Sequence, residues 1–182
     1  MMLSDRTIIE EIHKGRLVID PWSQDCLQPA SYDVHLGNNF IEYVYDSPIK
    51  ETIQSDLSDY DSYHIGPNRF VLACLKERIK LPNDICAIVH GKSSLAREGI
   101  MVHATAGFVD PGWDGVLTLE IFQLPVYWAG KVLKVGMPIA QVSFYRMDCE
   151  VARPYGHKDL KSKYQNSATV AVSANSITFN GN

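Results

Sequence analysis

The segment from His90 to Glu120 holds the side chains of this sequence that are best suited to chemistry. It opens with H-G-K-S-S-L-A-R, in which two cations, two hydroxyls and a flexible glycine lie within Gly91–Arg97: Lys92, Ser93, Ser94 and Arg97. Backbone N–H groups and hydroxyls can donate to a polyphosphate while Lys and Arg neutralise its charge. Taken alone, however, such a segment is more often an ordinary capped helical turn with solvated charges.

Two carboxylates lie further along the segment, and each has two possible tasks. Glu120 stands in the apolar run Leu117–Ile121, where it faces either a cleft or, more commonly, solvent. In a cleft, such a carboxylate can accept a proton from water as a general base. Asp110 begins the turn D-P-G-W, so it either accepts a hydrogen bond from a sugar hydroxyl or holds the turn through its own backbone.

Short strands must position these residues, because apolar runs alternate along the chain with Gly, Pro, Asn and Asp. Period-two alternation, as in residues 117–122, is typical of half-buried strands. Many short strands with turns between them predict a mainly β sandwich or barrel. The predicted strands are Leu17–Ile19, Ser31–Leu36, Phe40–Tyr45, Arg69–Leu75, Ile85–Val89, Met101–His103, Val116–Phe122, Lys131–Val135 and Ile139–Tyr145.

The remaining segments show other patterns. Residues 4–14 predict a short N-terminal helix that ends at Gly15, and Ser93–Glu98 predicts one helical turn. The polar residues 46–68 are typical of a long surface loop or a hairpin excursion. Residues 153–182 are polar and lack periodicity, which predicts a mobile tail that orders when a ligand binds. We therefore expect one domain over residues 1–182, with 153–182 as a tail closing over the ligand.

Composition limits the partners. The 182 residues carry a net charge of −4 and no long basic run, which argues against binding to duplex nucleic acid but not against a small anionic ligand. The four cysteines form no C-x-x-C pair, so neither a zinc knuckle nor a redox motif is present: Cys26, Cys74, Cys86 and Cys149. No apolar run is long enough to span a membrane. We expect a cytoplasmic protein, in the host cytoplasm if its origin is viral.

Several ordered blocks together resemble the dCTP deaminase family, a branch of the trimeric dUTPase superfamily. They are L-S-D-R-T-I and Q-P-A-S-Y-D-V-H-L-G near the start, G-K-S-S-L-A-R and H-A-T-A-G-F-V-D-P-G-W-D-G-V-L-T-L-E in the middle, and R-P-Y-G and S-K-Y-Q near the end. This resemblance covers most of the chain. It implies a dUTPase-like distorted β-barrel or jelly-roll with a short N-terminal helix and a mobile C-terminal tail. It also implies a homotrimer with active sites shared between subunits.

The resemblance implies a role for each matching residue. Glu120 aligns with the general base, Ser93 and Arg97 with residues that support it, and Ala106 with the carbonyl that helps to hold the attacking water. The positions implied to bind the substrate dCTP or dUTP are Lys92, Ser93, Ser94 and Arg97 around the phosphates, Asp110 at the deoxyribose, Thr118, Leu119 and Glu120 at the base, Gln141, and Tyr155 and Lys163 in the tail.

The implied chemistry is hydrolytic deamination at cytosine C4. One carboxylate can take a proton from water and return it to nitrogen. Zinc-dependent deaminases instead use an H-x-E and P-C-x-x-C set, which this sequence lacks. We therefore expect no zinc and no protein-held metal, with Mg²⁺ bound through the nucleotide triphosphate.

Two branches of the family differ in the fate of the deaminated nucleotide: one releases dUTP, and the other hydrolyses it to dUMP and diphosphate. Gly107 and Phe108, in T-A-G-F, and Gln141 resemble the bifunctional branch. A glycine at 107 is expected to leave room for water near the α-phosphate. The resemblance thus implies an enzyme that supplies dUMP for thymidylate synthesis.

Two departures and three alternatives stand beside this interpretation. Lys92 replaces the usual Arg and loses its bidentate fork, and Ser167 stands where a tail glutamine is usual.

The enzyme alternatives are a deaminase that releases dUTP and a dUTPase without deamination. Glu120 with Ser93, Arg97 and Ala106 argues against the second. The non-enzyme alternative is a nucleotide-sensing interaction protein, against which the intact catalytic set also argues.

Overall fold

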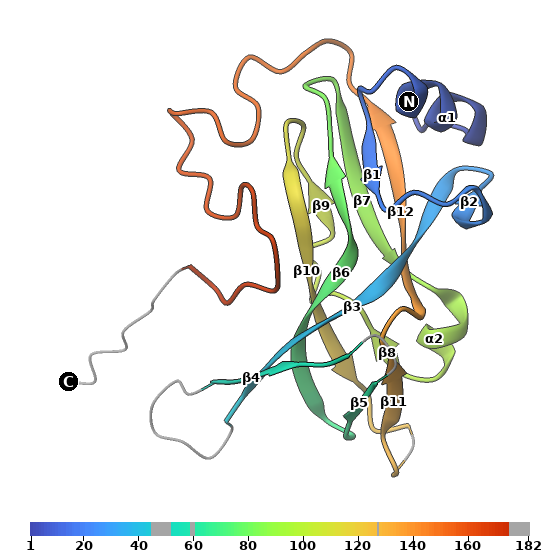
Figure 1. The fold of residues 1–182 in the computed structure, drawn as a ribbon, viewed down its shortest axis with the longest axis vertical. Helices are drawn as coiled ribbons and strands as arrows, with labels where there is room; N and C mark the ends of the chain where they lie inside the picture. Colours follow the sequence, from blue (N-terminus) through green and yellow to red (C-terminus); the bar gives the residue numbers. More distant parts are fainter. Residues whose placement is uncertain (45–51, 59–60, 127, 175–182) are drawn as a thin grey trace.

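The computed structural model describes residues 1–44, 52–58, 61–126 and 128–174. Twelve β-strands dominate these residues, with two short α-helices and one 3₁₀ turn (Figure 1). In chain order the elements are α1 (Asp5–His13), β1 (Val18–Asp20), the 3₁₀ turn Gln24–Cys26, β2 (Leu27–Gln28), β3 (Ser31–Tyr43), β4 (Thr52–Asp56), β5 (Ser62–Ile65), β6 (Arg69–Lys80), β7 (Ile85–Gly91), α2 (Ser93–Arg97), β8 (Ile100–Met101), β9 (Phe108–Val109), β10 (Asp114–Gln123), β11 (Lys131–Lys134) and β12 (Pro138–Arg146).

One curled antiparallel sheet contains most of the strands, in the order β8-β10-β6-β3-β12-β7-β9. Strand β1 pairs with β6, β2 and β4 pair with β3, and β11 and β5 form a separate two-stranded sheet. Strand β3 is central because it pairs with β12 near Asp33 and with β6 near Phe40. Its register shifts between Leu36 and Phe40, and such irregularities bend and twist a strand. The mainly β prediction is confirmed.

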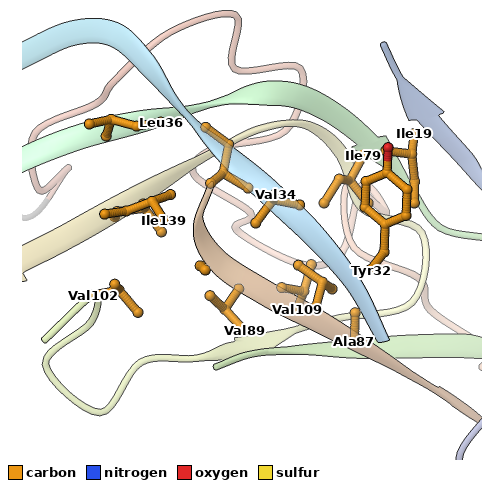
Figure 2. Packing of buried hydrophobic residues seen from close by; sticks show 14 of the residues in the cluster. Ile19, Tyr32, Val34, Leu36, Ile79, Ala87, Val89, Val102, Val109 and Ile139 are labelled. Carbon is orange, nitrogen blue, oxygen red and sulfur yellow. The ribbon is translucent and has the colours of Figure 1, made fainter. Parts of the chain in front are cut away.

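The apolar core fills the inside of this curled sheet (Figure 2). Tyr32, Val34 and Leu36 alternate along β3 and are fully buried, as period-two packing requires. They meet side chains from β6, β7, β9 and β12, among them Ile79, Ala87, Val89, Val109 and Ile139. Full burial of such a side chain stabilises the fold by about 1.5–3 kcal/mol. The core therefore fixes which face of each strand is left for the site.

Helix α1 is tied to the sheet by an ion-pair network around Glu11, whose side chain is buried. Arg16 Nε lies 2.7 Å and an Arg146 amino group 2.8 Å from the Glu11 carboxylate. Both arginines also reach Asp84. Burial raises the pKa of Glu11, but the hydrogen bonds and charges of Arg16 and Arg146 outweigh it, so the pKa is lowered overall. The network joins the N-terminal helix to the ends of β7 and β12.

Most of the predicted elements are confirmed, with differences at β3 and β8. The strands expected at 31–36 and 40–45 form one strand through residue 43, because Gly37–Asn39 makes a bulge rather than a turn. Gly37 fits there because a Cβ would lie only 2.5 Å from Cys74 Sγ. The strand expected at Met101–His103 is Ile100–Met101. The predicted strand end at residues 44–45 falls partly outside the described residues.

The prediction of a loop or hairpin at 46–68 is wrong for residues 52–56 and 62–65, whereas the other described residues of this segment form no helix or strand. Residues 52–56 and 62–65 are strands, and they pair with β3 and β11 rather than with each other. Strand β4 is largely exposed on both faces, so it carries no apolar alternation that would reveal it. Residues 45–51 and 59–60 lie outside the described part.

Candidate active site

A cavity of about 410 Å³ lies over the face of β10 that points away from the core. Six of the residues singled out from the sequence line it: Ala106, Phe108, Asp110, Thr118, Glu120 and Tyr155. They come from the loop around β9, from β10 and from the C-terminal segment. The structure therefore brings together Glu120, Ala106 and Asp110, the residues predicted to act as the base, the water-holding carbonyl and the sugar contact.

Strand alternation explains why Glu120 reaches this cavity. Leu119 and Ile121 point into the core, with 1% and 0% of their surfaces exposed, so Thr118 and Glu120 face the other way. Glu120 Oε2 accepts a hydrogen bond of 2.9 Å from the backbone N–H of Ala104. This hydrogen bond is made by Oε2 and does not involve Oε1. One oxygen is thus anchored, and the other can act toward a water in the cavity.

Leu119 is placed differently from the sequence-based expectation. Its side chain belongs to the core, where it packs with the buried cluster. Any contact of this residue with a base must therefore be made by its backbone. Thr118 does face the cavity, and its hydroxyl accepts a hydrogen bond of 3.0 Å from the backbone N–H of Ala171.

The loop before β9 is tightly constrained around Gly107. The Gly107 carbonyl accepts a 2.8 Å hydrogen bond from Val89 N–H. A Cβ on residue 107 would lie 2.8 Å from the Val89 oxygen and 3.1 Å from His103 Nε2. Thr105, two residues earlier, has a φ of 78°, which is unusual for a side chain other than Gly. Protein atoms, not open space, therefore lie where a side chain on residue 107 would begin.

Part of the C-terminal segment, residues 166–171, lies along β10 and contributes to the lining of the cavity. Figure 1 shows the path of this segment outside the sheet. Val116 N–H donates to the Ser167 carbonyl at 2.8 Å, and Asn166 N–H donates to the Asp114 carbonyl at 2.7 Å. Tyr164, Ser167 and Ala171 line the cavity. Residues 166–171 of the predicted tail are thus held against β10 without forming a strand, and residues 175–182 lie outside the described part.

The R-P-Y-G and D-P-G-W motifs meet in space. Tyr155 N–H donates to the Pro111 carbonyl at 2.8 Å, and the Tyr155 ring packs on Trp113 with ring centres 5.3 Å apart. A Cβ on Gly112 would lie 2.5 Å from Pro154 Cβ, and the φ of Gly112 is +85°. Glycine is needed here for both reasons. This contact brings Tyr155 beside Asp110.

The phosphate-binding candidates are elsewhere in the single chain. None of them lines the cavity around Glu120: Lys92, Ser93, Ser94, Arg97, Gln141 and Lys163. Helix α2 begins at Ser93 and leaves Ser93, Ser94 and Arg97 exposed. Lys92 Nζ lies 2.7 Å from Asp33 Oδ2, and Gln141 accepts a hydrogen bond from the Ser31 hydroxyl.

The structure adds residues to which the sequence pointed only weakly. Tyr43 and Phe70 line the cavity with their rings 6.0 Å apart. Burial raises the pKa of Tyr43, with smaller contributions from Tyr164 and the Glu120 carboxylate. The two residues come from β3 and β6, and only the pairing of these strands with β10 brings them near Glu120. No local motif could have identified them.

Metal cages and membrane-spanning helices are both lacking in the part of the chain that the structure describes. Among these residues no group of three His, Cys, Asp or Glu side chains is arranged to hold a metal ion. No helix in the same residues has the length and apolar character needed to cross a membrane.

Comparison with known proteins identifies the family. A family model described as dCTP deaminase-like matches residues 2–147. The proteins named "dCTP deaminase, dUMP-forming" from Dictyoglomus thermophilum and Methanoculleus marisnigri are 39% and 40% identical, over 98% and 94% of this chain and 97% and 94% of theirs. A crystal structure of 2'-deoxycytidine 5'-triphosphate deaminase from Agrobacterium tumefaciens has the same fold, with a TM-score of 0.62 and 22% identity, over 79% of this chain and 47% of that longer one. This chain belongs to the dCTP deaminase-like family.

Proposed function

We propose that this protein deaminates dCTP at cytosine C4 and hydrolyses the resulting dUTP to dUMP and diphosphate. The observation that carries the proposal is the Glu120 carboxylate, which belongs to the lining of the cavity and is anchored through Oε2 by Ala104 N–H. The relatives named dCTP deaminase, dUMP-forming support both steps, since they match nearly the whole chain. The product dUMP would supply thymidylate synthesis in the cytoplasm.

The first step adds water and expels ammonia. A water held between Glu120 Oε1 and the Ala106 carbonyl attacks C4 as Glu120 takes its proton. Glu120 returns protons to the ring nitrogen and to the departing amine, so that dCTP and water give dUTP and ammonia. Thr118 and the backbone of Leu119 read the base edge, and Asp110 accepts a hydrogen bond from the sugar hydroxyl.

The phosphates are bound across a subunit boundary in a homotrimer. In one chain the cations and hydroxyls of Gly91–Arg97, which we call the phosphate loop, do not line the cavity around Glu120. A neighbouring subunit would supply them to complete the site: Lys92, Ser93, Ser94, Arg97 and Gln141. Tyr155 and Lys163 of the C-terminal segment would cover the triphosphate. A site shared between two subunits requires that, within one chain, the residues that bind the nucleobase lie apart from those that bind the phosphates.

Magnesium would bind through the triphosphate. Mg²⁺ keeps several waters and commonly binds through substrate phosphates rather than in an all-protein cage. When bound, the ion neutralises phosphate charge, while Lys92 and Arg97 supply the protein's own positive charge.

The second step is hydrolysis at the α-phosphate, which releases dUMP and diphosphate. Gly107 directly precedes β9 and Phe108 is the first residue of that strand, and Phe108 lines the cavity with 58% of its surface exposed. The exposed ring is available to contact a nucleotide or a neighbouring subunit.

One assay tests the proposal. The purified protein is incubated with dCTP and excess Mg²⁺, and ammonia, diphosphate and nucleotides are measured at partial conversion. We expect equal amounts of ammonia, diphosphate and dUMP, with little free dUTP. Ammonia with dUTP and no diphosphate would identify a deaminase alone, and conversion of added dUTP without ammonia from dCTP would identify a dUTPase. No turnover of either nucleotide would leave a binding protein.

A further inference from the structure

Strand β3 contacts two of the phosphate-binding candidates through side chains that the proposed mechanism does not use. Ser31 and Asp33 are two residues apart, so they lie on the same face of the strand. The Ser31 hydroxyl donates to Gln141 Oε1 at 3.2 Å, and Asp33 Oδ2 lies 2.7 Å from Lys92 Nζ. These contacts join residues that are more than fifty positions apart in the sequence.

The sheet register explains why these side chains meet. Gln141 on β12 stands opposite Asp33 on β3 and opposite His90 on β7. Lys92 comes one residue after the end of β7. The three strands therefore place Asp33, Gln141 and the start of the phosphate loop side by side. Backbone pairing between the strands fixes this arrangement, so it does not depend on the conformations of flexible side chains.

The ion pair between Lys92 and Asp33 is sheltered. Only 24% of the Lys92 side chain and 16% of the Asp33 side chain are exposed. Asp33 Oδ1 is buried, and no donor in the described residues reaches it. Gln28 adds one long contact of 3.4 Å to Oδ2. A buried carboxylate needs a partner, so Asp33 holds the ammonium group in one place.

Both contacts leave the donors that a phosphate needs. An ammonium has three N–H donors, and Asp33 engages one of them. Gln141 accepts through Oε1, so its amide hydrogens remain directed elsewhere. A group held in its binding orientation loses less freedom when the ligand arrives.

We propose that Asp33 and Ser31 are positioning residues for the polyphosphate site: Asp33 fixes Lys92, and Ser31 fixes the amide of Gln141. The inference rests on the proposed function, since it takes Lys92 and Gln141 as phosphate contacts. It also accounts for a lysine at position 92, because a point charge without a bidentate fork depends on an external group for its direction.

Charge and positioning predict opposite effects of Asp33→Asn, which makes the test sharp. Asparagine removes a negative charge beside the phosphates, so electrostatics alone would strengthen nucleotide binding. Loss of positioning would weaken it. We expect the KM for dCTP to rise about tenfold, the size of one well-placed hydrogen bond to a charged group, with kcat within about twofold. Ser31→Ala should raise the KM about threefold, since it removes one neutral hydrogen bond.

A double-mutant cycle shows whether Asp33 acts through Lys92. In a Lys92→Met background, Asp33→Asn should have no further effect on the KM, whereas independent effects would multiply. Asp84→Asn is the matched control, because Asp84 also has 16% of its side chain exposed and pairs with an arginine far from the phosphate loop. It should lower thermal stability and leave the KM unchanged.

Calorimetry with magnesium and inorganic tripolyphosphate gives a second measurement that needs no turnover. Wild-type protein should bind this probe, and Asp33→Asn and Ser31→Ala should bind it more weakly. An unchanged or lower KM in Asp33→Asn, multiplicative effects with Lys92→Met, or unaltered tripolyphosphate binding in Ser31→Ala would overturn the inference. Wild-type protein that binds tripolyphosphate but releases no ammonia from dCTP would overturn the proposed function alone.

Discussion

Gly107 and Val89 are in direct backbone contact: Val89 N–H donates to the Gly107 carbonyl at 2.8 Å, and the Val89 oxygen lies 2.8 Å from where a Cβ on Gly107 would be. Three residues earlier, Ala104 N–H holds the Glu120 carboxylate. The glycine that distinguishes the T-A-G-F segment is therefore coupled through one short loop to the proposed base. The expectation from the sequence was that Gly107 provides room for a water; the structure shows that it provides close packing of backbone.

The coupling predicts that even a methyl group at position 107 impairs catalysis. Gly107→Ala would push the loop away from Val89 by a few tenths of an ångström and shift Ala104 and Ala106 with it. We expect kcat for ammonia release to fall by about 10- to 100-fold, because small misplacements at a reacting centre have effects of this size. Gly66→Ala is the control, since its Cβ would meet only Arg69 Cγ, at 3.4 Å. Unchanged kcat in Gly107→Ala would show that the loop is not coupled to Glu120.

The shared-site arrangement predicts complementation between two inactive variants. Glu120→Gln and Arg97→Ala, each nearly inactive alone, are mixed, unfolded and refolded together. In randomly mixed trimers about a quarter of the boundary sites would combine an intact Glu120 with an intact Arg97 from the neighbour. Ammonia release should therefore return to about a quarter of the wild-type rate per site. No recovery, in trimers shown by mass to be mixed, would place both residues in the same subunit's site.

The network around Glu11 predicts a defined loss of stability in acid. Because the pKa of Glu11 is below its usual 4.5 in the folded protein, the carboxylate stabilises the fold above about that pH and loses this contribution as pH falls through the lower folded value. Glu11→Gln should lower the free energy of unfolding at pH 7 by about 1.5–3 kcal/mol. The difference from wild type should narrow below about pH 4.

Denaturant unfolding at pH 7 and at pH 3.5 measures this difference. Glu10→Gln is the control, because Glu10 is exposed and lies 3.9 Å from Lys14. That change should alter stability by no more than about 0.5 kcal/mol at either pH. A Glu11→Gln deficit that stayed constant between the two pH values would mean that the carboxylate charge does not stabilise the fold.

Elements were predicted best from the sequence where the residue pattern and the structure that it forms lie within one short stretch of chain. Alternation of Leu119 and Ile121 with Glu120 placed the carboxylate on one face of a strand, and the helix at Asp5–His13 was predicted from its apolar spacing and the glycine at its end. Strand β4 was missed because an edge strand exposed on both faces carries no apolar period. The sequence predicts a break at residues 37–39 where the structure has a bulge, because glycine and asparagine are common both in turns and in bulges.

The candidate site was predicted in part, for a related reason. The motif from His103 to Glu120 is contiguous, and several of its members line one cavity. The pairing of Asp33 with Lys92 and the approach of Tyr43 to Glu120 depend on which strands are neighbours in the sheet. Ser31 and Asp33 belong to the Q-P-A-S-Y-D-V-H-L-G block of the family resemblance. Only the register of β3 with its neighbouring strands shows that Ser31 contacts Gln141 and that Asp33 contacts Lys92.

The role of Glu120 as the base is tested most directly by Glu120→Gln, which keeps the shape of the side chain and an oxygen for Ala104 N–H but removes proton acceptance. General acid–base help is typically worth about 10²- to 10⁴-fold in rate. Ammonia release from dCTP should fall by at least about 10²-fold, while dCTP binding, measured by calorimetry, stays within about threefold of wild type. Glu98→Gln, which changes a carboxylate paired with Lys131 outside the cavity, should retain wild-type activity. Near-normal ammonia release from folded Glu120→Gln would contradict the assignment of Glu120 as the base.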